Sequence, residues 1–223
     1  MVRTKNLNRL FIFSNLIVLF LHRSYCGGIP IKYVLTGGPG VGKTTLLDEL
    51  KKAGFNTVSE TATTLINEAK AAGNPNPAYD QKFIQEFQKN IWCKQRSNEQ
   101  NIPIDKITFL DRGLIDGLAY CNLYNQEPPP GLRIDAAQSS YEIVFILDFL
   151  DFYERNEGRQ ENNEQAHNIA NLIDEVYQEY GYIPNQTLIH VPAFLYDENK
   201  KRLPLQASVS KRVEFILEKI NNH

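Results

Sequence analysis

Short apolar runs alternate with longer amphipathic stretches from Ile31 to the end of the chain. This alternation is typical of a parallel β-sheet whose strands are connected by crossover helices, so we expect an α/β fold. The first apolar run shows no alternation with polar positions, which indicates a central strand buried on both faces. The predicted strands are residues 32–35, 56–58, 107–110, 142–147 and 187–191, and the predicted helices begin near Lys43, Thr61, Gln81, Leu114, Ala166 and Ser208.

Two segments rich in proline and glycine interrupt this pattern. Residues 73–77 separate two of the predicted helices, and residues 127–131 predict a surface loop, because both residue types disfavour the interior of helices and strands. The sequence contains no internal repeat and no long low-complexity linker. We therefore expect a single domain over residues 31–223.

The first thirty residues follow a different pattern. Three basic residues precede an apolar run at residues 10–21, which is shorter than the ~20 residues that cross a bilayer. A basic start and a short apolar middle resemble a signal peptide, but no small-x-small cleavage site follows. A peripheral amphipathic anchor and extra codons ahead of the true start are the alternatives. Because the fold can begin at Ile31, we interpret residues 1–30 as a non-catalytic extension.

The composition narrows the function classes. The chain has 223 residues, of which 42% are hydrophobic, so it can bury one sizeable core. Its formal net charge of −2 provides no basic excess of the kind that binds nucleic acid, and we expect no nucleic-acid partner. Contact with a membrane is expected only if residues 1–30 are retained in the mature protein.

The cysteines indicate a reducing compartment. Cys26, Cys93 and Cys121 are odd in number and widely spaced, and they form no Cys-x-x-Cys or Cys/His ligand pattern. Such a set is typical of free thiols rather than of a disulfide framework or a zinc site. We therefore expect packing roles for all three cysteines and a cytoplasmic localisation.

One segment matches the phosphate-binding pattern G-x-x-x-x-G-K-[ST]. It follows the first predicted strand directly and opens an amphipathic helix, which is the context that the pattern requires. Glycines in such a loop permit positive φ and a close approach of the backbone to phosphate, and successive N–H groups at a helix N terminus form a nest for anions. The residues of the segment are Gly37, Gly38, Pro39, Gly40, Val41, Gly42, Lys43 and Thr44.

The side chains that end this segment suggest which ligand it binds. Lys43 is expected to reach the β- and γ-phosphates of a nucleotide, and the hydroxyl of Thr44 to ligate Mg²⁺. Thr45 is predicted to contact the α-phosphate. The alternative is a glycine-rich turn without a ligand, which the order of strand, loop, Lys-Thr pair and helix disfavours. The segment thus predicts nucleotide binding, with ATP and Mg²⁺ as cofactors, but it does not identify the reaction.

A second candidate site lies at the end of the third predicted strand, where Asp111 is followed by Arg112. The carboxyl ends of the strands form the edge at which open α/β sheets bind ligands. Asp111 is therefore predicted to coordinate Mg²⁺ through water or to act as a base, and Arg112 to hold an anionic or polar substrate group. A helix N-cap is the other role open to Asp111.

Glu60 lies just after the second predicted strand, at the same edge of the sheet. Its carboxylate is a candidate base for an attacking hydroxyl or water, or else a first-turn glutamate that complements the helix dipole. Asp116 follows Arg112 by one helical turn, and it either orients that arginine or belongs to a solvated face.

Residues 153–161 form a polar, charged segment between a predicted strand and a predicted helix. Arginines on such a segment can close over a triphosphate and neutralise the charge that develops in the transition state, as a lid does in phosphoryl transfer. Arg155 and Arg159 are the candidates. The alternative is an exposed charged loop, but the upstream phosphate loop favours the lid.

Several motifs occur in the order in which a known family has them. They are the phosphate loop, Glu60, residues 109–113 with Asp116, Arg159-x-Glu161 with Ala166, Tyr177, residues 180–182 and residues 191–192. The set resembles the family of small P-loop proteins described as "AAA domain" or "predicted ATPase/kinase", with related domains in ribosylnicotinamide-kinase-like and TRPL-translocation-defect-like proteins. The resemblance covers nearly the whole chain from Ile31 onward.

This resemblance implies a three-layer P-loop fold of the nucleoside- and nucleotide-kinase type, with a five-stranded parallel sheet in the order 2-3-1-4-5 and a helical lid. In such kinases a carboxylate after the second strand is the usual candidate base, a role that falls on Glu60. An acidic-Arg pair after the third strand works at the phosphoryl acceptor, a role that falls on Asp111 and Arg112. The role of the lid arginine falls on Arg159, whereas Arg155 has no clear counterpart in the family.

Two functions from different classes remain open. In the first, an ATP-dependent kinase transfers the γ-phosphate to a small, hydroxyl-bearing, nucleoside-like metabolite, and Lys43, Mg²⁺, Arg112 and Arg159 neutralise the charge. In the second, the chain is an ATPase switch whose lid is read by a partner. A GTPase is disfavoured because residues 199–202 lack the aspartate of an Asn-Lys-x-Asp segment. An AAA+ motor is disfavoured because no helical lid domain of the needed length follows the core.

Overall fold

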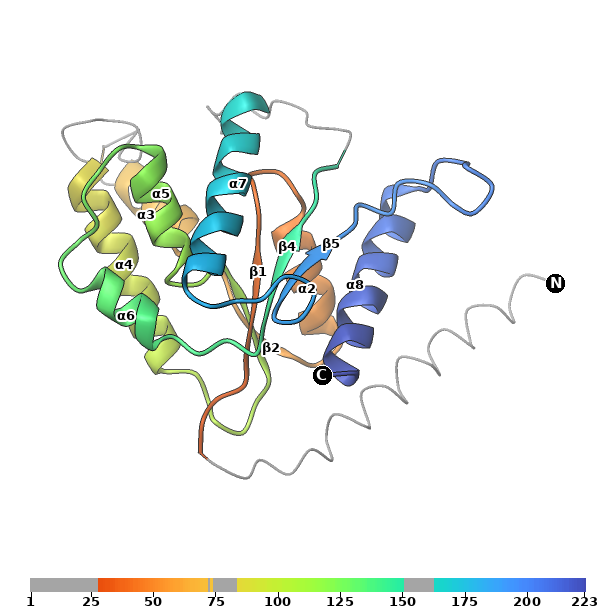
Figure 1. Cartoon of the computed structure of the whole chain (residues 1–223), viewed down its shortest axis with the longest axis horizontal. Coiled ribbons are helices and arrows are strands. Elements are labelled where there is room, and N and C mark those ends of the chain that lie inside the picture. The colour runs from red at the N-terminus through yellow and green to blue at the C-terminus, as the bar shows by residue number, and fades with distance from the viewer. Residues whose placement is uncertain (1–27, 72, 74–83, 151–162) are drawn as a thin grey trace.

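The computed structural model describes residues 28–71, 73, 84–150 and 163–223. These residues form a five-stranded, all-parallel sheet in the order β2-β3-β1-β4-β5 (Figure 1). The strands are β1 (Lys32–Thr36), β2 (Asn56–Val58), β3 (Thr108–Asp111), β4 (Ile143–Leu147) and β5 (Leu188–Val191). The structure thus confirms the α/β fold and the strand order that the resemblance implies. Each strand begins and ends within one residue of its predicted bounds.

Seven helices lie in the described part of the chain: α2 (Lys43–Lys52), α3 (Thr61–Ala71), α4 (Ile84–Gln100), α5 (Asp116–Leu123), α6 (Leu132–Gln138), α7 (Asn163–Glu179) and α8 (Leu205–Asn221). The sequence pattern does not predict α6. This helix buries only Leu132 and Ala136, which are too few apolar positions to show a helical period. Helix α4 corresponds to the helix predicted near Gln81, a residue outside the described range.

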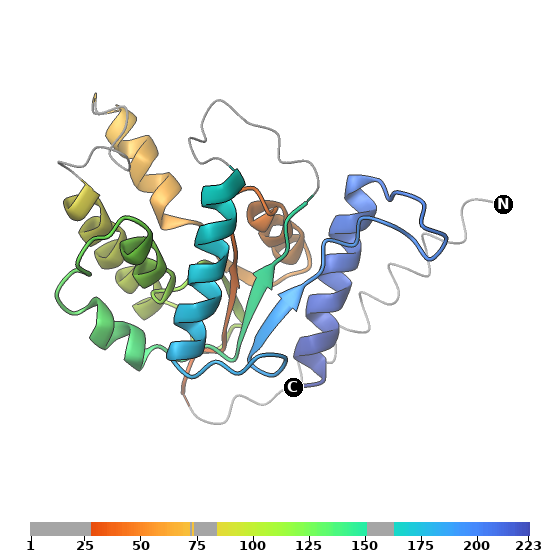
Figure 2. The same cartoon turned by 45° about the horizontal axis from the view of Figure 1, so that its top comes forward.

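The helices cover the two faces of the sheet as separate layers (Figures 1 and 2). On one face, α2 packs against α8 and contributes Leu46 to an apolar cluster that includes Tyr33 of β1. On the other face, α5 packs against α7, which contributes Ile173 to a second cluster that includes Val34 of β1. Adjacent residues of β1 therefore enter opposite layers, as the pleat of a strand requires. This confirms that β1 is a central strand buried on both faces.

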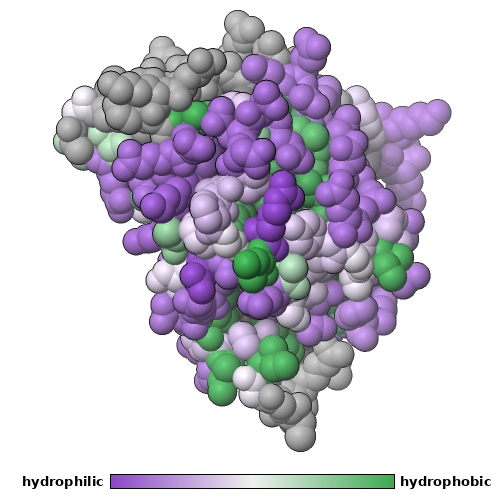
Figure 3. Space-filling model, turned by 60° about the vertical axis from the view of Figure 1, so that its left-hand side comes forward, coloured by the Kyte–Doolittle hydropathy of each residue, from purple (hydrophilic) through white to green (hydrophobic). Residues whose placement is uncertain are grey.

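None of the described helices combines the length and the apolar character that crossing a bilayer requires. On the face shown in Figure 3, hydrophobic residues lie scattered among hydrophilic ones. Of the cysteines, Cys121 is buried but Cys93 is exposed, so the packing role expected for Cys93 is wrong. Cys26 lies outside the described residues.

Candidate active site

The loop between β1 and α2 brings the phosphate-binding motif to the carboxyl edge of the sheet. The loop turns at Gly37, Gly40 and Gly42, whose φ angles of 127°, 79° and 91° lie in the left-handed region that favours glycine. A Cβ atom on Gly37 would also lie 2.9 Å from the carbonyl oxygen of Leu147. Gly42 is the N-cap of α2, and no side chain caps this end of the helix. The positive end of α2 is therefore open to an anion.

Lys43 is buried beneath this loop, with 7% of its surface exposed. Its Nζ donates hydrogen bonds to the carbonyl oxygens of Gly38 at 3.0 Å and Gly37 at 3.5 Å. Burial, with the neighbouring charge of Arg112, lowers the pKa of Lys43 to about 8. An anion in the loop would oppose both effects, so Lys43 is suited to bind phosphate.

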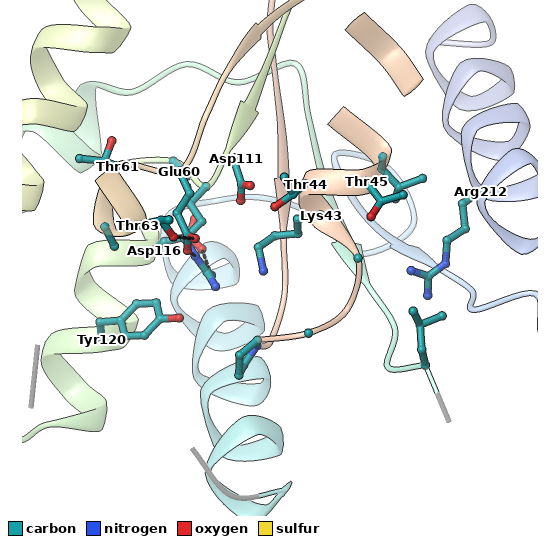
Figure 4. Close-up of a pocket in the computed structure, with 18 of the residues that line it drawn as sticks. Lys43, Thr44, Thr45, Glu60, Thr61, Thr63, Asp111, Asp116, Tyr120 and Arg212 are labelled. Atoms are coloured by element: carbon teal, nitrogen blue, oxygen red, sulfur yellow. Dashed lines mark hydrogen bonds and ion pairs between the residues drawn. The ribbon is translucent and has the colours of Figure 1, made fainter. Parts of the chain in front are cut away.

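Thr44, Thr45 and Asp111 line the cavity next to Lys43 (Figure 4). The side chains of Thr44 and Thr45 are exposed, whereas Asp111 is only 2% exposed. The Oδ1 atom of Asp111 is buried and has no hydrogen-bond partner among the described residues. Burial raises the pKa of Asp111 to about 6, although Lys43 opposes the shift. Helix α5 begins at Asp116, so the N-cap alternative for Asp111 is wrong.

This arrangement fits a bound Mg²⁺ ion. A hard divalent cation prefers oxygen ligands, and Thr44 and the buried Oδ1 of Asp111 are the oxygens that lie next to the phosphate loop. The described residues contain no cluster of three or more His, Cys, Asp or Glu side chains that could hold a metal alone. Phosphate oxygens and water would therefore complete the coordination, as is usual for Mg²⁺ in nucleotide sites.

Arg112 lies at the centre of the buried polar network. Its Nε donates to Oε1 of Glu60 at 2.9 Å, and its Nη1 donates to Oδ1 of Asp116 at 3.2 Å and to the carbonyl oxygen of Gly37 at 3.1 Å. Its backbone is left-handed, with a φ angle of 70°, which is uncommon for a residue other than glycine. Burial opposes the charge of Arg112, but Tyr120 and the carboxylates raise its pKa well above the ordinary value.

Asp116 fixes the position of Arg112 from α5. Both of its oxygens accept two hydrogen bonds, from Thr36 and Arg112 on one side and from the N–H of Gly113 and the hydroxyl of Tyr177 on the other. The side chain is 3% exposed. The solvated face considered for Asp116 is therefore wrong, and the bond to Arg112 is present.

Glu60 immediately precedes α3 and contacts Arg112 from the opposite side. Its Oε1 accepts from Arg112, and its Oε2 accepts from the hydroxyl of Thr63 at 2.6 Å. Burial alone would raise the pKa of Glu60, but Arg112 and Lys43 outweigh burial and lower it to about 2. Glu60 is therefore ionised at neutral pH. Its position before the first turn of α3 also makes the helix-dipole role compatible with the role at the site.

A cavity of about 1050 Å³ extends on both sides of the phosphate loop. Glu60 and Asp116 lie on one side of Lys43, and Arg212 lies on the other (Figure 4). We define the α4 lobe by its lining residues Ile66, Phe87, Gln88, Ile91, Tyr120 and Tyr124. We define the α8 lobe by Leu150, Leu203, Pro204, Leu205 and Val209. The cavity therefore has two lobes, with Lys43 and Asp111 between them (Figure 4).

Arg212 of α8 is a residue of the site that the sequence did not single out. It is 1% exposed. Its Nη1 donates to the carbonyl oxygen of Val41 and its Nη2 to that of Asp148, both at 2.6 Å, and its Nε donates to that of Pro192 at 3.0 Å. A signal was present, because Arg212 shares a helix face with Val209 and Ile216, three and four residues away, which are both buried.

Comparison with protein-family models decides the family. A model described as "AAA domain" matches residues 32–189, well over half of the chain. The chain belongs to the AAA domain family. A search of curated proteins found no match to the sequence.

Solved structures with the same fold include two kinds of protein. NadR in complex with NR has a TM-score of 0.60 at 19% identity, and the match covers 86% of this AAA domain protein and 50% of NadR. Deoxyadenosine kinase from M.mycoides, with dCMP and dCDP bound, has a TM-score of 0.57 at 17% identity. This match covers 86% of this chain and 99% of the kinase. NadR in complex with NAD and AMP-PNP has a TM-score of 0.57 at 16% identity, and the match covers 86% of this chain and 49% of NadR. This chain thus spans about half the length of NadR. At these identities the likeness shows the fold alone, which is the five-stranded parallel α/β fold described above.

The remaining predicted residues of this AAA domain protein fall outside the described range. They are Arg155, Arg159 and Glu161 of the expected lid, together with residues 1–27 of the expected N-terminal extension. Within the described range, the structure brings together the phosphate loop, Glu60, Asp111 and Arg112 around one cavity.

Proposed function

We propose that this AAA domain protein is an ATP-dependent kinase that transfers the γ-phosphate of ATP to a hydroxyl group of a small, nucleoside-like metabolite. One observation carries the proposal. The Glu60 carboxylate borders the cavity on the side of the α4 lobe, where it is ionised and held by Arg112 and Thr63. An acceptor in the α4 lobe would place its hydroxyl between this carboxylate and a phosphate held by Lys43.

The nucleotide would occupy the phosphate loop and the α8 lobe. The open N terminus of α2 and the Lys43 ammonium favour the β- and γ-phosphates, and Thr45, which lines the cavity, would contact the α-phosphate. Thr44 and Asp111 would hold Mg²⁺, which neutralises the charge on the phosphate oxygens when bound. The base would lie against the apolar residues of the α8 lobe.

The chemical step is a single displacement at phosphorus. The acceptor hydroxyl oxygen forms a bond to the γ-phosphorus, the bond from that phosphorus to the β-phosphate oxygen breaks, and ADP leaves with the electron pair. Glu60 takes the hydroxyl proton. Because the transition state of phosphoryl transfer is loose, positioning contributes more than base strength, so a carboxylate of low pKa can serve. Arg112, and Arg159 of the expected lid, would neutralise the transferring group.

The chemistry of the α4 lobe supports a nucleoside-like acceptor. Phe87, Ile91 and Tyr120 provide apolar walls, and the buried carboxamide of Gln88 provides a polar group of the kind that orients a ligand. A heteroaromatic base on a hydroxyl-bearing sugar matches this combination. The neighbours named for a complex with NR and for deoxyadenosine kinase support the same class.

The test is ADP release by the purified full-length chain with ATP and Mg²⁺, alone and with pools of nucleosides and pyridine ribosides. We expect acceptor-dependent ADP release and a phosphorylated acceptor detected by mass spectrometry. Glu60→Gln should lower kcat by about 100-fold or more, because general-base catalysis is lost. ATP affinity should stay near wild type. The exposed Glu68 of α3 provides the matched control, and Glu68→Gln should keep full activity.

The opposite result is equally clear. If ATP binds and is hydrolysed slowly, at a rate that no acceptor changes, the kinase proposal is wrong. The ATPase switch then becomes the better hypothesis.

A further inference from the structure

The side chain of Gln95 connects the two segments that carry the Glu60–Arg112 ion pair. Gln95 belongs to α4, is 4% exposed and borders the cavity. Its Nε2 donates to the carbonyl oxygen of Arg112 at 3.0 Å, and its Oε1 accepts the hydroxyl of Thr61 at 2.6 Å. Because Thr61 directly follows Glu60, one carboxamide binds the chain next to both members of the pair.

The bond to Arg112 restrains a backbone that is uncommon for arginine. Arg112 has a φ angle of 70°, a conformation that costs a residue other than glycine about 1–3 kcal/mol unless its surroundings enforce it. The N–H of Arg112 donates to the carbonyl oxygen of Leu35 at 3.0 Å, and its own carbonyl accepts from Gln95. Both polar groups of this peptide backbone are therefore fixed, and the direction of the guanidinium follows from them.

A buried carboxylate fixes Gln95 in turn. Nε2 of Gln95 also donates to Oε1 of Glu99 at 3.2 Å. Glu99 accepts from the hydroxyl of Tyr141 at 2.9 Å and pairs with Lys32 at 3.4 Å. The carboxamide thus has a partner for each of its N–H groups and for its oxygen. Its orientation is determined by the fold and does not depend on a ligand.

We propose that Gln95 is a positioning residue, which holds Glu60 and Arg112 in the relative geometry that phosphoryl transfer requires without touching the reacting atoms. This inference rests on the proposed function in so far as the pair is catalytic. The charged groups that surround the pair are Lys43 of α2, Asp111 of β3 and Asp116 of α5. None of these side chains bonds to Gln95, so their contributions to the pair can be separated from that of Gln95.

The experiment uses a readout that does not need an acceptor. The Nε–H signal of Arg112 is followed by NMR in the ¹⁵N-labelled full-length chain and assigned by its loss in Arg112→Lys. In wild type this buried, carboxylate-bonded N–H should exchange slowly with solvent. Gln95→Met, which is similar in size but lacks both polar groups, should shift the signal and speed its exchange. Gln100→Met, at the exposed end of the same helix, is the control and should change neither.

Two further variants separate the hydrogen bond between Gln95 and Arg112 from the hydrogen bond between Gln95 and Thr61. Gln95→Glu keeps the acceptor for Thr61 but loses the donors to Arg112 and Glu99, so it should shift the signal as Gln95→Met does. Thr61→Val removes the bond from Thr61 to Gln95, together with the bond that Thr61 accepts from Asn98 at 3.3 Å, and it keeps the bond from Gln95 to Arg112, so it should shift the signal less. If Gln95→Met does not fold, this pair of variants provides the same comparison.

Turnover then tests whether the geometry matters for catalysis. In the presence of an accepted substrate, Gln95→Met should lower kcat by about 10- to 100-fold with ATP affinity unchanged, since small displacements of catalytic groups have effects of this size. An Arg112 signal that is unchanged in folded Gln95→Met overturns the inference, whether or not an acceptor is found. An unchanged kcat also overturns it. If the signal shifts but wild type never shows acceptor-dependent turnover, the proposed kinase function is wrong. The positioning of Arg112 by Gln95 is then still supported.

Discussion

Two buried arginines on either side of the phosphate loop are held in opposite ways. Arg112 is bonded to two carboxylates, of Glu60 and Asp116, in addition to one carbonyl oxygen. Arg212 donates to three carbonyl oxygens, and among the described residues it forms no ion pair. The first arginine belongs to an electrostatic network, whereas the second connects three segments of main chain.

The difference is visible in the pKa values. Burial lowers the pKa of Arg212 to about 10, with only partial opposition from Asp148, whereas the groups around Arg112 more than offset burial and raise its pKa. Under the proposed function, Arg112 would therefore exchange a carboxylate for a substrate phosphate and keep its charge paired. Arg212 has no carboxylate partner of this kind among the described residues, and the three carbonyl oxygens that it binds belong to three separate segments of the chain. We infer that Arg112 has a catalytic role and that Arg212 has a structural role.

The largest expected effect separates the two arginines by turnover. Arg112→Met should lower acceptor-dependent kcat by about 1000-fold, because an arginine that neutralises the transferring phosphoryl group contributes on that order. Steady-state ADP release with a saturating acceptor measures it. Arg112→Lys should recover little, since a lysine cannot bond Glu60 and Asp116 at once. A loss below tenfold would contradict the chemical role of Arg112.

The next effect separates the two arginines by stability. Arg212→Met leaves three carbonyl oxygens without a donor and should lower the free energy of unfolding by about 3 kcal/mol. Urea denaturation measures it, and Lys211→Met on the adjacent, partly exposed residue is the control. The folded fraction of Arg212→Met should bind ATP more weakly. Unchanged stability would show that the three carbonyls do not need this arginine.

A smaller effect concerns Asp111, whose burial beside Lys43 and Arg112 is expected to lower the stability of the fold at neutral pH. Asp111 has a pKa raised from 3.8 to about 6, so its stabilising contribution is complete below pH ~4 and is lost as the pH rises through 6. Asp111→Asn should therefore increase the free energy of unfolding at pH 7 by about 1–3 kcal/mol, and the gain should vanish near pH 4. Urea denaturation at both pH values measures this. Asp111→Asn should also abolish the tightening of ATP binding by Mg²⁺, and chelation of Mg²⁺ should have the same effect on wild type.

The smallest effect concerns the residue between the two arginines. Because the pKa of Lys43 is lowered to about 8, free protein should lose the Lys43 charge as the pH rises through 8. ATP affinity measured by calorimetry should fall several-fold from pH 7 to pH 9. Lys43→Met should bind weakly at both pH values and show no such slope. A slope that persists in Lys43→Met would assign the titration to another group.

The sequence predicted the part of the site whose signals are local. The phosphate loop is contiguous, and Glu60 and Asp111 follow directly from strand ends, so pattern and topology were sufficient to bring them to one edge. Asp116 was left with two roles, because its partners Thr36 and Tyr177 lie 80 and 61 residues away. The spacing of one helical turn suggests the bond to Arg112, but only the three-dimensional contacts decide between this bond and a solvated face.

The contacts of Arg212 and Gln95 could not be found in this way, although Arg212 shares a helix face with the apolar residues Val209 and Ile216. Arg212 binds only backbone carbonyl oxygens, and Gln95 reaches Arg112 through one, so no residue type in the sequence marks these contacts. The helix α6 was missed for a different reason, since its seven residues bury only Leu132 and Ala136. The hydrophobic pattern of the sequence therefore identifies neither the partner of a long-range main-chain contact nor a short helix.

The contact between Arg212 and the loop has a consequence for the order of events during synthesis. Val41 and Arg212 are separated by 171 residues, so the ribosome has produced almost the whole nucleotide-binding strand, loop and sheet before the arginine that fixes the loop exists. A nascent chain that carries the phosphate motif therefore lacks its final clamp until α8 emerges. If the protein binds a nucleotide as proposed, tight binding would become a late step of biogenesis, and chains that terminate before α8 would bind it weakly.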